Sequence, residues 1–238
     1  MCFACRSVAQ RLGAALAPVF PVRLCPLPSP LYTVLVGYKE APVDEARERY
    51  APMVRKLLAH FAAEHAPCLA AAAGGTLHAV LPVPSTARPG GAPLARVPGL
   101  AAAVCAQLGA VDWLPRALVR AEAPVGHMRP DADAFTVLAA ARDQVAGRRV
   151  VVLDDTYVSG ARAQSAAVAL RHAGARGVVI MVVGRVLRPG RSALHGSFLS
   201  RQRGRVPQAG AAPGAQAGGG PRVAAPCCRC VQTPAVTE

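Results

Sequence analysis

The sequence predicts an α/β domain with a mainly parallel sheet flanked by helices. Short apolar stretches alternate with helical stretches along most of the chain, which is the pattern of successive strand–helix–strand units. The clearest unit combines an apolar stretch at 150–153, two acidic residues, a short loop of small residues, and a helix over 161–173 that Gly174 ends. Residues 177–183 are again apolar, as expected for the next parallel strand.

The N-terminal part is expected to divide into a short extension and the start of the domain. Residues 1–30 hold a helical stretch and a proline-rich linker, and residues 31–36 are predicted to form a strand. A helix is predicted over 43–65, with an interruption at Pro52. Its buried face is expected to hold Val54, Leu57, Leu58 and Phe61. Its solvated face is expected to hold Arg47, Arg49, Arg55 and Lys56.

The central part is expected to add two strands and two helical stretches. The strands are predicted at 76–83 and 113–119, and the helical stretches at 93–108 and 135–145. A loop or a loose helix end is expected at 68–75, and loops rich in proline, glycine or charged residues are expected at 84–91 and 120–134. These elements complete a predicted domain over residues 31–187.

Residues 188–238 form a predicted low-complexity tail. Alanine, glycine, proline, serine, glutamine and arginine dominate it, so it cannot bury enough apolar surface to order itself. An arginine-rich tail of this kind offers electrostatic binding to nucleic acid, and a merely solvated tail is the alternative. The whole chain of 238 residues carries a net charge of +14, which favours phosphate-bearing partners of any kind.

The cysteines and the hydropathy bear on compartment and metals. Cys2 and Cys5 form one Cys-x-x-Cys pair, and Cys227 and Cys230 form another at the opposite end of the chain. If the termini meet, the four thiolates predict a zinc site; unliganded thiols are the alternative. No apolar run reaches the ~20 residues that span a bilayer, so the chain is interpreted as cytoplasmic, without a membrane partner. Nothing in the sequence indicates its oligomeric state.

The acidic pair Asp154–Asp155 is the strongest candidate for chemistry. Ligands of open parallel sheets bind beyond the carboxyl ends of the strands. The small-residue loop that follows lets backbone N–H groups and the helix dipole face an anion. Carboxylates beside an anion site make sense if they hold hydroxyls, a metal ion, or both. A ligand with a phosphate and a polyhydroxyl ring fits, and a solvated turn at an ordinary strand end is the alternative.

This run resembles the signature of type I phosphoribosyltransferases: an apolar strand, two adjacent aspartates, a few variable residues, and a loop of glycine and small or hydroxyl residues. Within that superfamily, the chain is most similar to ComF-like phosphoribosyltransferase-domain proteins, in which a Cys-x-x-Cys segment precedes the domain. Gly37-Tyr38-Lys39-Glu40 also resembles the Tyr-Lys that begins the ComF-like domain. Haloacid dehalogenases are less similar, because one residue separates their two acids.

The resemblance implies a site for phosphoribosyl pyrophosphate with Mg²⁺. Asp154 and Asp155 would hold the ribose hydroxyls and steady the developing cationic sugar. The loop would cradle the 5-phosphate with Val158, Ser159, Gly160, Ala161 and Arg162. A second loop would bind the pyrophosphate with Ser85, Thr86 and Arg88, and a plain Pro/Gly turn is the alternative there.

Two functions therefore stand side by side. One is an enzyme, a phosphoribosyltransferase of unknown acceptor, which the intact aspartate pair favours. The other is a non-catalytic protein on the same fold that senses a ligand or works on nucleic acid, since ComF-like proteins are linked with DNA uptake. The basic tail favours the second, and so does Arg162, which stands where the family's loop has its last hydroxyl residue. Thr156-Tyr157 is a further departure from the family pattern, which has an aliphatic pair there.

Overall fold

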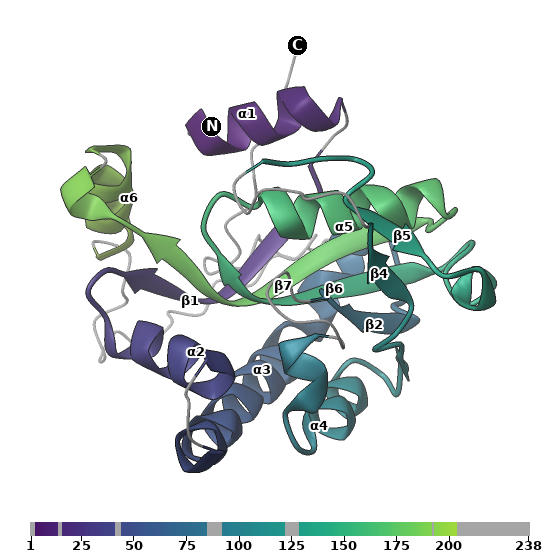
Figure 1. The fold of residues 1–238 in the computed structure, drawn as a ribbon, viewed down its shortest axis with the longest axis horizontal. Coiled ribbons are helices and arrows are strands. Elements are labelled where there is room, and N and C mark those ends of the chain that lie inside the picture. Colours follow the sequence, from purple (N-terminus) through teal and green to yellow (C-terminus); the bar gives the residue numbers. More distant parts are fainter. Residues whose placement is uncertain are drawn as a thin grey trace, which may run out of the picture.

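The fold is built on one five-stranded, wholly parallel sheet (Figure 1). The computed structural model describes residues 3–13, 16–40, 44–84, 92–121, 129–191 and 193–203. In the order in which they lie in the sheet, the strands are β1 (Val19–Pro26), β7 (Gly177–Leu187), β6 (Arg149–Tyr157), β2 (Ala79–Pro82) and β3 (Asp112–Trp113). A parallel sheet covered by helices confirms the predicted fold class.

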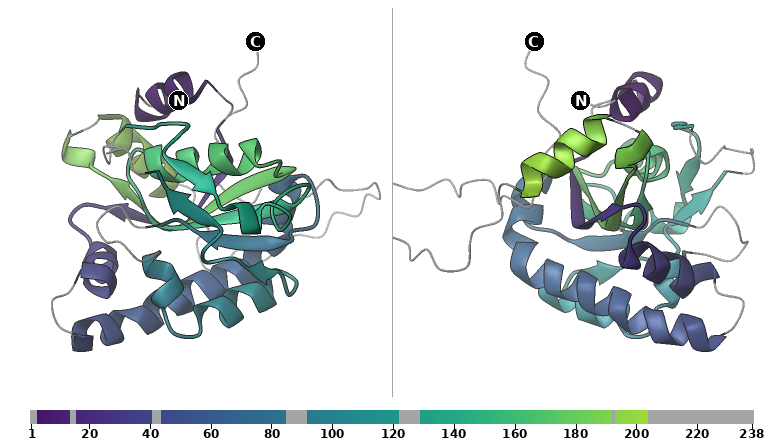
Figure 2. Two further views of the ribbon diagram at one scale, coloured as in Figure 1. Left: turned by 45° about the vertical axis from the view of Figure 1, so that its right-hand side comes forward. Right: turned by 90° about the vertical axis from the view of Figure 1, so that its left-hand side faces the viewer.

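Helices cover both faces of the sheet, as Figures 1 and 2 show. One face carries α2 (Pro30–Glu40), α3 (Asp44–Ala73), the short 3-10 helix η1 (Pro93–Arg96) and α4 (Leu100–Gln107). The other carries α5 (Ala161–His172), the antiparallel pair β4 (Leu118–Arg120) and β5 (Phe135–Val137), the 3-10 helix η2 (Ala139–Ala141), and α1 (Phe3–Leu12) packed on α5. Beyond β7 lie the 3-10 helix η3 (Pro189–Arg191) and α6 (Ala193–Arg203).

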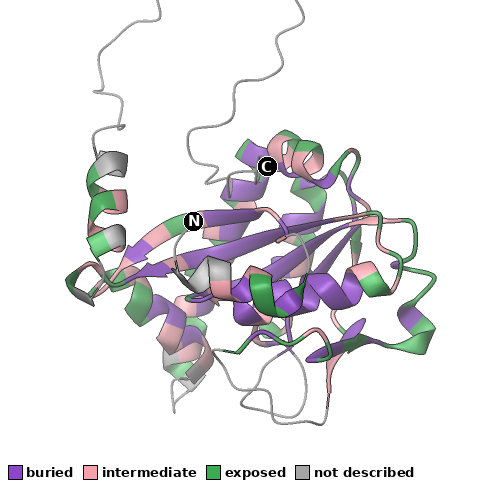
Figure 3. Cartoon of the chain, turned by 90° about the horizontal axis from the view of Figure 1, so that it is seen from above, coloured by how far each residue is buried: buried purple, intermediate pink, exposed green. Residues whose placement is uncertain are grey.

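The central strands are buried on both faces (Figure 3), and their side chains alternate between two cores. Along β6, Val151 and Leu153 belong to the core under α3, whereas Val150 and Val152 belong to the core under α5. This alternation also decides which way the two aspartates further along β6 point.

The N-terminal part differs most from the sequence-based expectation. Residues 19–26, expected in a separate extension, form β1 and pair with β7, so the sheet begins before the predicted boundary at residue 31. Pro21 fits there because β1 is an edge strand and one side of it donates no ladder hydrogen bonds. The strand predicted at 31–36 is wrong, because these residues lie in α2. Its buried Val34, Leu35 and Tyr38 have helical spacing, and a short apolar run alone does not separate helix from strand.

Helix α3 also runs further than predicted. Pro52 does not end it, and Pro67 lies within it as well. Of the two alternatives for 68–75, the helix end is confirmed, because α3 continues to Ala73 and two glycines with positive φ then end it. The predicted apolar face is confirmed, since Val54, Leu58 and Phe61 are buried and Leu57 packs against them. Burial of this long face compensates for the hydrogen bonds that the prolines remove.

Three smaller corrections concern the rest of the chain. The helical stretch expected at 135–145 is strand β5 followed by η2, and only the ends of the strand expected at 113–119 are strands, in β3 and β4. The tail predicted to lack order begins with helix α6, whereas residues 204–238 lie outside the described residues. None of the helices in the described part of the chain is both long and apolar enough to cross a membrane.

A buried glutamine ties the N-terminal segment to the domain. The side chain of Gln164, on α5, accepts a hydrogen bond from the N–H of Ala17 at 2.8 Å and donates one to its carbonyl at 3.0 Å. Both residues are almost wholly buried. This amide pairs with the backbone as a neighbouring strand would, and it thereby holds the start of β1 against α5.

Replacing Gln164 is expected to lower stability. Gln164→Leu keeps the volume but leaves a buried N–H and carbonyl without partners, which costs about 1–3 kcal/mol. The measurement is urea unfolding, with Gln144→Leu, at an exposed position, as the matched control. Equal stability of the two variants would contradict this role of the amide.

Candidate functional site

The aspartate pair lies within the last part of β6, which runs on to Tyr157, and not in a turn after the strand. Asp154 is 4% exposed and Asp155 is 2% exposed, so the alternative of a solvated acidic turn is wrong. Because neighbouring residues of a strand point to opposite faces, Asp155 faces the α2 and α3 side and Asp154 faces the α5 side. Each carboxylate meets a different helix.

Asp155 is held by the last turn of α2. The hydroxyl of Tyr38 donates to its Oδ2 at 2.6 Å, and Lys39 Nζ lies 3.2 Å from Oδ2 and 3.3 Å from Oδ1. Burial opposes the charge of Asp155, but Lys39 and Arg162, with the Tyr38 hydrogen bond, bring its pKa below the ordinary value. Burial, and then the adjacent carboxylate, raises the pKa of Tyr38 well above its usual value, so this hydroxyl keeps its proton.

Asp154 is held by the first turn of α5. One terminal nitrogen of Arg162 lies 2.5 Å from Asp154 Oδ1, and Nε lies 3.4 Å from Oδ2. The same terminal nitrogen lies 3.4 Å from Asp155 Oδ1, so Arg162 spans both acids. Burial raises the pKa of Asp154 and the charge of Asp155 adds to this, while Arg162 acts against it. The nearby Asp154 raises the pKa of Arg162, which stays charged.

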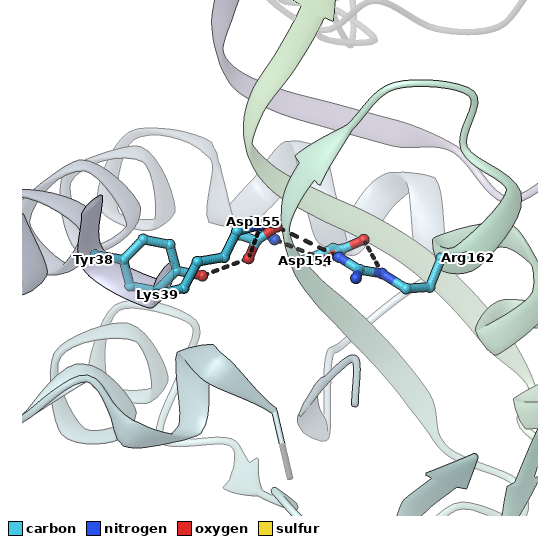
Figure 4. Close-up of polar contacts among 5 residues, drawn as sticks. All are labelled: Tyr38, Lys39, Asp154, Asp155 and Arg162. Carbon is cyan, nitrogen blue, oxygen red and sulfur yellow. Dashed lines mark hydrogen bonds and ion pairs between the residues drawn. The ribbon is translucent and has the colours of Figure 1, made fainter. Parts of the chain in front are cut away.

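Together, Lys39, Asp154, Asp155 and Arg162 form a four-charge cluster (Figure 4). Its formal charges cancel, so the two cations offset the desolvation penalty of burying two carboxylates. The side chains of Lys39 and Arg162 are 19% and 24% exposed, against 3% and 5% for Asp155 and Asp154. A ligand arriving from solvent therefore meets the cations first and the carboxylates behind them.

The loop after β6 has the small-residue shape that the sequence predicts. Gly160 takes a left-handed φ of 84° at the N-cap of α5, and the Ser159 hydroxyl accepts from the N–H of Ala161 at 3.3 Å. A Cβ at Gly160 would lie only 2.1 Å from the Tyr157 hydroxyl, so the tyrosine ring packs directly against the loop at this glycine. Val158 is exposed at its tip. The roles of this loop in phosphate binding remain predictions.

Strand order places the carboxyl ends of β2 and β6 side by side. The two strands are neighbours, yet the chain leaves β2 toward α4 on one face and leaves β6 toward α5 on the other (Figure 1). This divergence is a topological switch point, where open α/β sheets form a crevice that binds ligands. The four-charge cluster lies at this switch point, near the carboxyl end of β6.

Several predicted site residues lie outside the described residues. Ser85, Thr86 and Arg88 belong to the undescribed stretch 85–91, which begins three residues after the end of β2 at Pro82. The same holds for Cys2, Cys227 and Cys230, while Cys5 lies in α1 with its side chain undescribed. The zinc site therefore remains a prediction. Within the described part of the chain, no three His, Cys, Asp or Glu side chains gather closely enough to hold a metal ion alone.

Sequence reasoning missed the partners of the aspartates. Neither Tyr38 nor Lys39 is predicted from the sequence to contact the aspartates. The only signal for them was the resemblance of Tyr38-Lys39 to the start of the ComF-like domain. Arg162, expected among the phosphate-binding residues, lies against Asp154 in the structure, a contact that the sequence does not indicate.

Comparisons with known proteins give a distant match to solved structures and no match by sequence. No family model matches the sequence, and a search of curated proteins finds no match. Eleven chains of solved structures match. One is described as the structure of the allosteric regulatory enzyme of purine biosynthesis; it is 21% identical, with a TM-score of 0.30, over 51% of this chain and 25% of that chain. The match thus spans about a quarter of that enzyme's length. At this level of similarity, no activity follows for the chain.

Proposed function

We propose that the chain is a phosphoribosyltransferase-like protein that binds phosphoribosyl pyrophosphate, or a close relative, at the switch point between β2 and β6. The observation that carries the proposal is the four-charge cluster at the topological switch point. A phosphorylated pentose needs cations for its phosphates and carboxylates for its hydroxyls. The cluster presents both within one site, and the resemblance of the β6–α5 unit to the phosphoribosyltransferase signature points to the same ligand.

The role proposed for each residue of the cluster follows from how exposed its side chain is and where it lies. Lys39 and Arg162 stand at the outer side of the cluster and would meet the phosphate groups by charge-assisted hydrogen bonds. Ribose hydroxyls would then replace these two cations as the partners of Asp154 and Asp155. The N–H groups at the start of α5 would face the 5-phosphate. The exchange matters because buried carboxylates cannot lose a cation without gaining another partner.

Magnesium fits the donor chemistry of the aspartates. Mg²⁺ is commonly held by one or two carboxylates together with substrate phosphates, so a complete protein cage is not required. Asp154 and Asp155 are the residues that would hold it. Its chemistry there would be to neutralise charge on the pyrophosphate group.

A second candidate is ligand sensing without transfer. It is favoured by Arg162, which occupies the position of a loop hydroxyl and lies 2.5 Å from Asp154. A cation fixed on the acid that should support the cationic sugar works against catalysis. In this case the chain would bind the sugar phosphate and leave it intact.

Isothermal titration with phosphoribosyl pyrophosphate tests the proposal. We expect binding that requires magnesium and that Asp154→Asn/Asp155→Asn weakens about 10-fold or more, because each charge-assisted hydrogen bond is worth about 1.5–3 kcal/mol. The control is Glu45→Gln/Asp143→Asn, which removes two exposed acids elsewhere. Equal affinity of wild type and the aspartate variant would remove the assignment. Pyrophosphate release with a panel of nucleobases then separates transfer from sensing.

A further inference from the structure

A cleft opens next to the four-charge cluster, between α2, the first half of α3 and the segment around η1. Its volume is about 460 Å³. This lies within the range of roughly 300–1,000 Å³ that is typical of small-molecule sites. Tyr38 and Lys39 form the wall that it shares with the cluster, whereas the two aspartates do not line it. The cleft is therefore a neighbour of the proposed sugar-phosphate site, with its own lining.

The lining combines positive charge with rigid apolar walls. Four cationic side chains line the cleft, those of Lys39, Arg47, Arg55 and Arg96. As far as the chain is described, Glu48 is the one acidic residue among them. Three prolines and two aliphatic residues provide the rest of the wall. Such a lining suits a ligand that is both anionic and apolar, because the arginines attract the charge and the walls cover the ring or chain.

One face of α3 lines the cleft, and another face of the same helix is exposed away from it. Residues 47, 48, 51, 52 and 55 recur at helical spacing and share the face beside the cleft. Arg47 and Arg55, expected simply in solvent, thus line a concave surface, whereas Arg49 and Lys56 lie exposed elsewhere on the same helix. Arg55 also donates to the carbonyl of Pro98 at 3.3 Å, which links α3 to the opposite rim.

We propose that this cleft is a binding site for a small organic anion that carries an aromatic or otherwise apolar body. Lys39 contacts Asp155 and lines the cleft, so an anion bound there competes with Asp155 for the same ammonium group. Occupation of the cleft thereby changes the electrostatics of the aspartate pair. This proposal goes beyond the proposed function, and it holds whether or not the chain binds phosphoribosyl pyrophosphate.

The test is a fluorescence titration of the full chain with 8-anilinonaphthalene-1-sulfonate, an aromatic anion, in the absence of sugar phosphate. The neutral dye N-phenyl-1-naphthylamine reports on apolar binding alone. We expect saturable binding of one anion, weakened about 10-fold or more by Arg55→Met/Arg96→Met, which removes two charge-assisted contacts. Affinity for the neutral dye should change less than about 2-fold, because the apolar walls remain.

The matched control is Arg49→Met/Lys56→Met, which removes the same charge from the exposed face of α3. It should leave the anion affinity within about 2-fold, because exposed charges outside the cleft are screened. The single change Arg96→Glu, at an exposed position, guards against misfolding of the double variant and should also weaken the anion. Equal losses in the two double variants, no loss in either, or no saturable binding would each overturn the proposal.

Discussion

Arg162→Met is expected to destabilise the protein by about 3–5 kcal/mol at neutral pH, because it leaves a buried carboxylate without its cation. Arg162 spans both aspartates and lies 2.5 Å from Asp154, which is nearly inaccessible to solvent. A methionine keeps most of the apolar stem and removes the charge alone. The measurement is urea unfolding at pH 7, followed by circular dichroism.

The loss should shrink as the pH falls. Burial already raises the pKa of Asp154 in the folded chain, and loss of Arg162, which acts against this, raises it further. A folded-state pKa above the unfolded value of about 4 means that the folded variant takes up a proton first as the pH falls. Its stability therefore rises toward acid pH relative to wild type. A deficit that is the same at pH 7 and pH 5 would contradict this explanation.

The double variant Asp154→Asn/Arg162→Met is the control for the charge. It replaces the ion pair by two neutral groups, so it should recover a large part of the stability lost in Arg162→Met. No recovery would mean that Arg162 stabilises the fold through its packing and not through Asp154.

Gly160→Ala is expected to give the second large loss. A left-handed φ costs an L-residue about 1–2 kcal/mol, and φ at Gly160 is 84°. The added Cβ would also lie 2.1 Å from the Tyr157 hydroxyl, so the ring must move, and overpacking of this kind costs about 1–3 kcal/mol more. The loop that the proposed function needs would lose its shape together with its stability.

Comparison with Gly109→Ala separates the cost of the contact with Tyr157 from the cost of the left-handed φ. Gly109 has a φ of 97°, yet a Cβ there would meet nothing within 4 Å. Thermal unfolding of both variants should therefore show a clearly larger drop for Gly160→Ala. Magnesium-dependent binding of phosphoribosyl pyrophosphate should weaken in Gly160→Ala only. Matching melting temperatures would show that Tyr157 yields to the methyl group at no cost.

The unit β6–α5–β7 could be predicted from the sequence because its signals are local. A β-branched apolar run, two acids, small loop residues and a glycine stop each act within a few residues. The prediction failed where a local signal is ambiguous or is overridden by tertiary packing. The apolar run at 31–36 fits a strand or a helix equally well, and burial of one face of α2 in the core shared with α3 decides for the helix. Packing likewise carries α3 through Pro52.

By itself, the sequence determined that a mainly parallel α/β sheet carries an aspartate pair near the end of a central strand, followed by a short loop that contains small residues. Tertiary structure alone decided what those aspartates contact. Tyr38 lies 117 positions from Asp155, and no periodicity relates residues so far apart. The two meet because β6 presents its neighbouring side chains to opposite faces, and α2 and α5 bring a cation to each face. A buried charge needs an opposite charge or a hydrogen-bond donor or acceptor beside it, and only the packed chain brings such partners together.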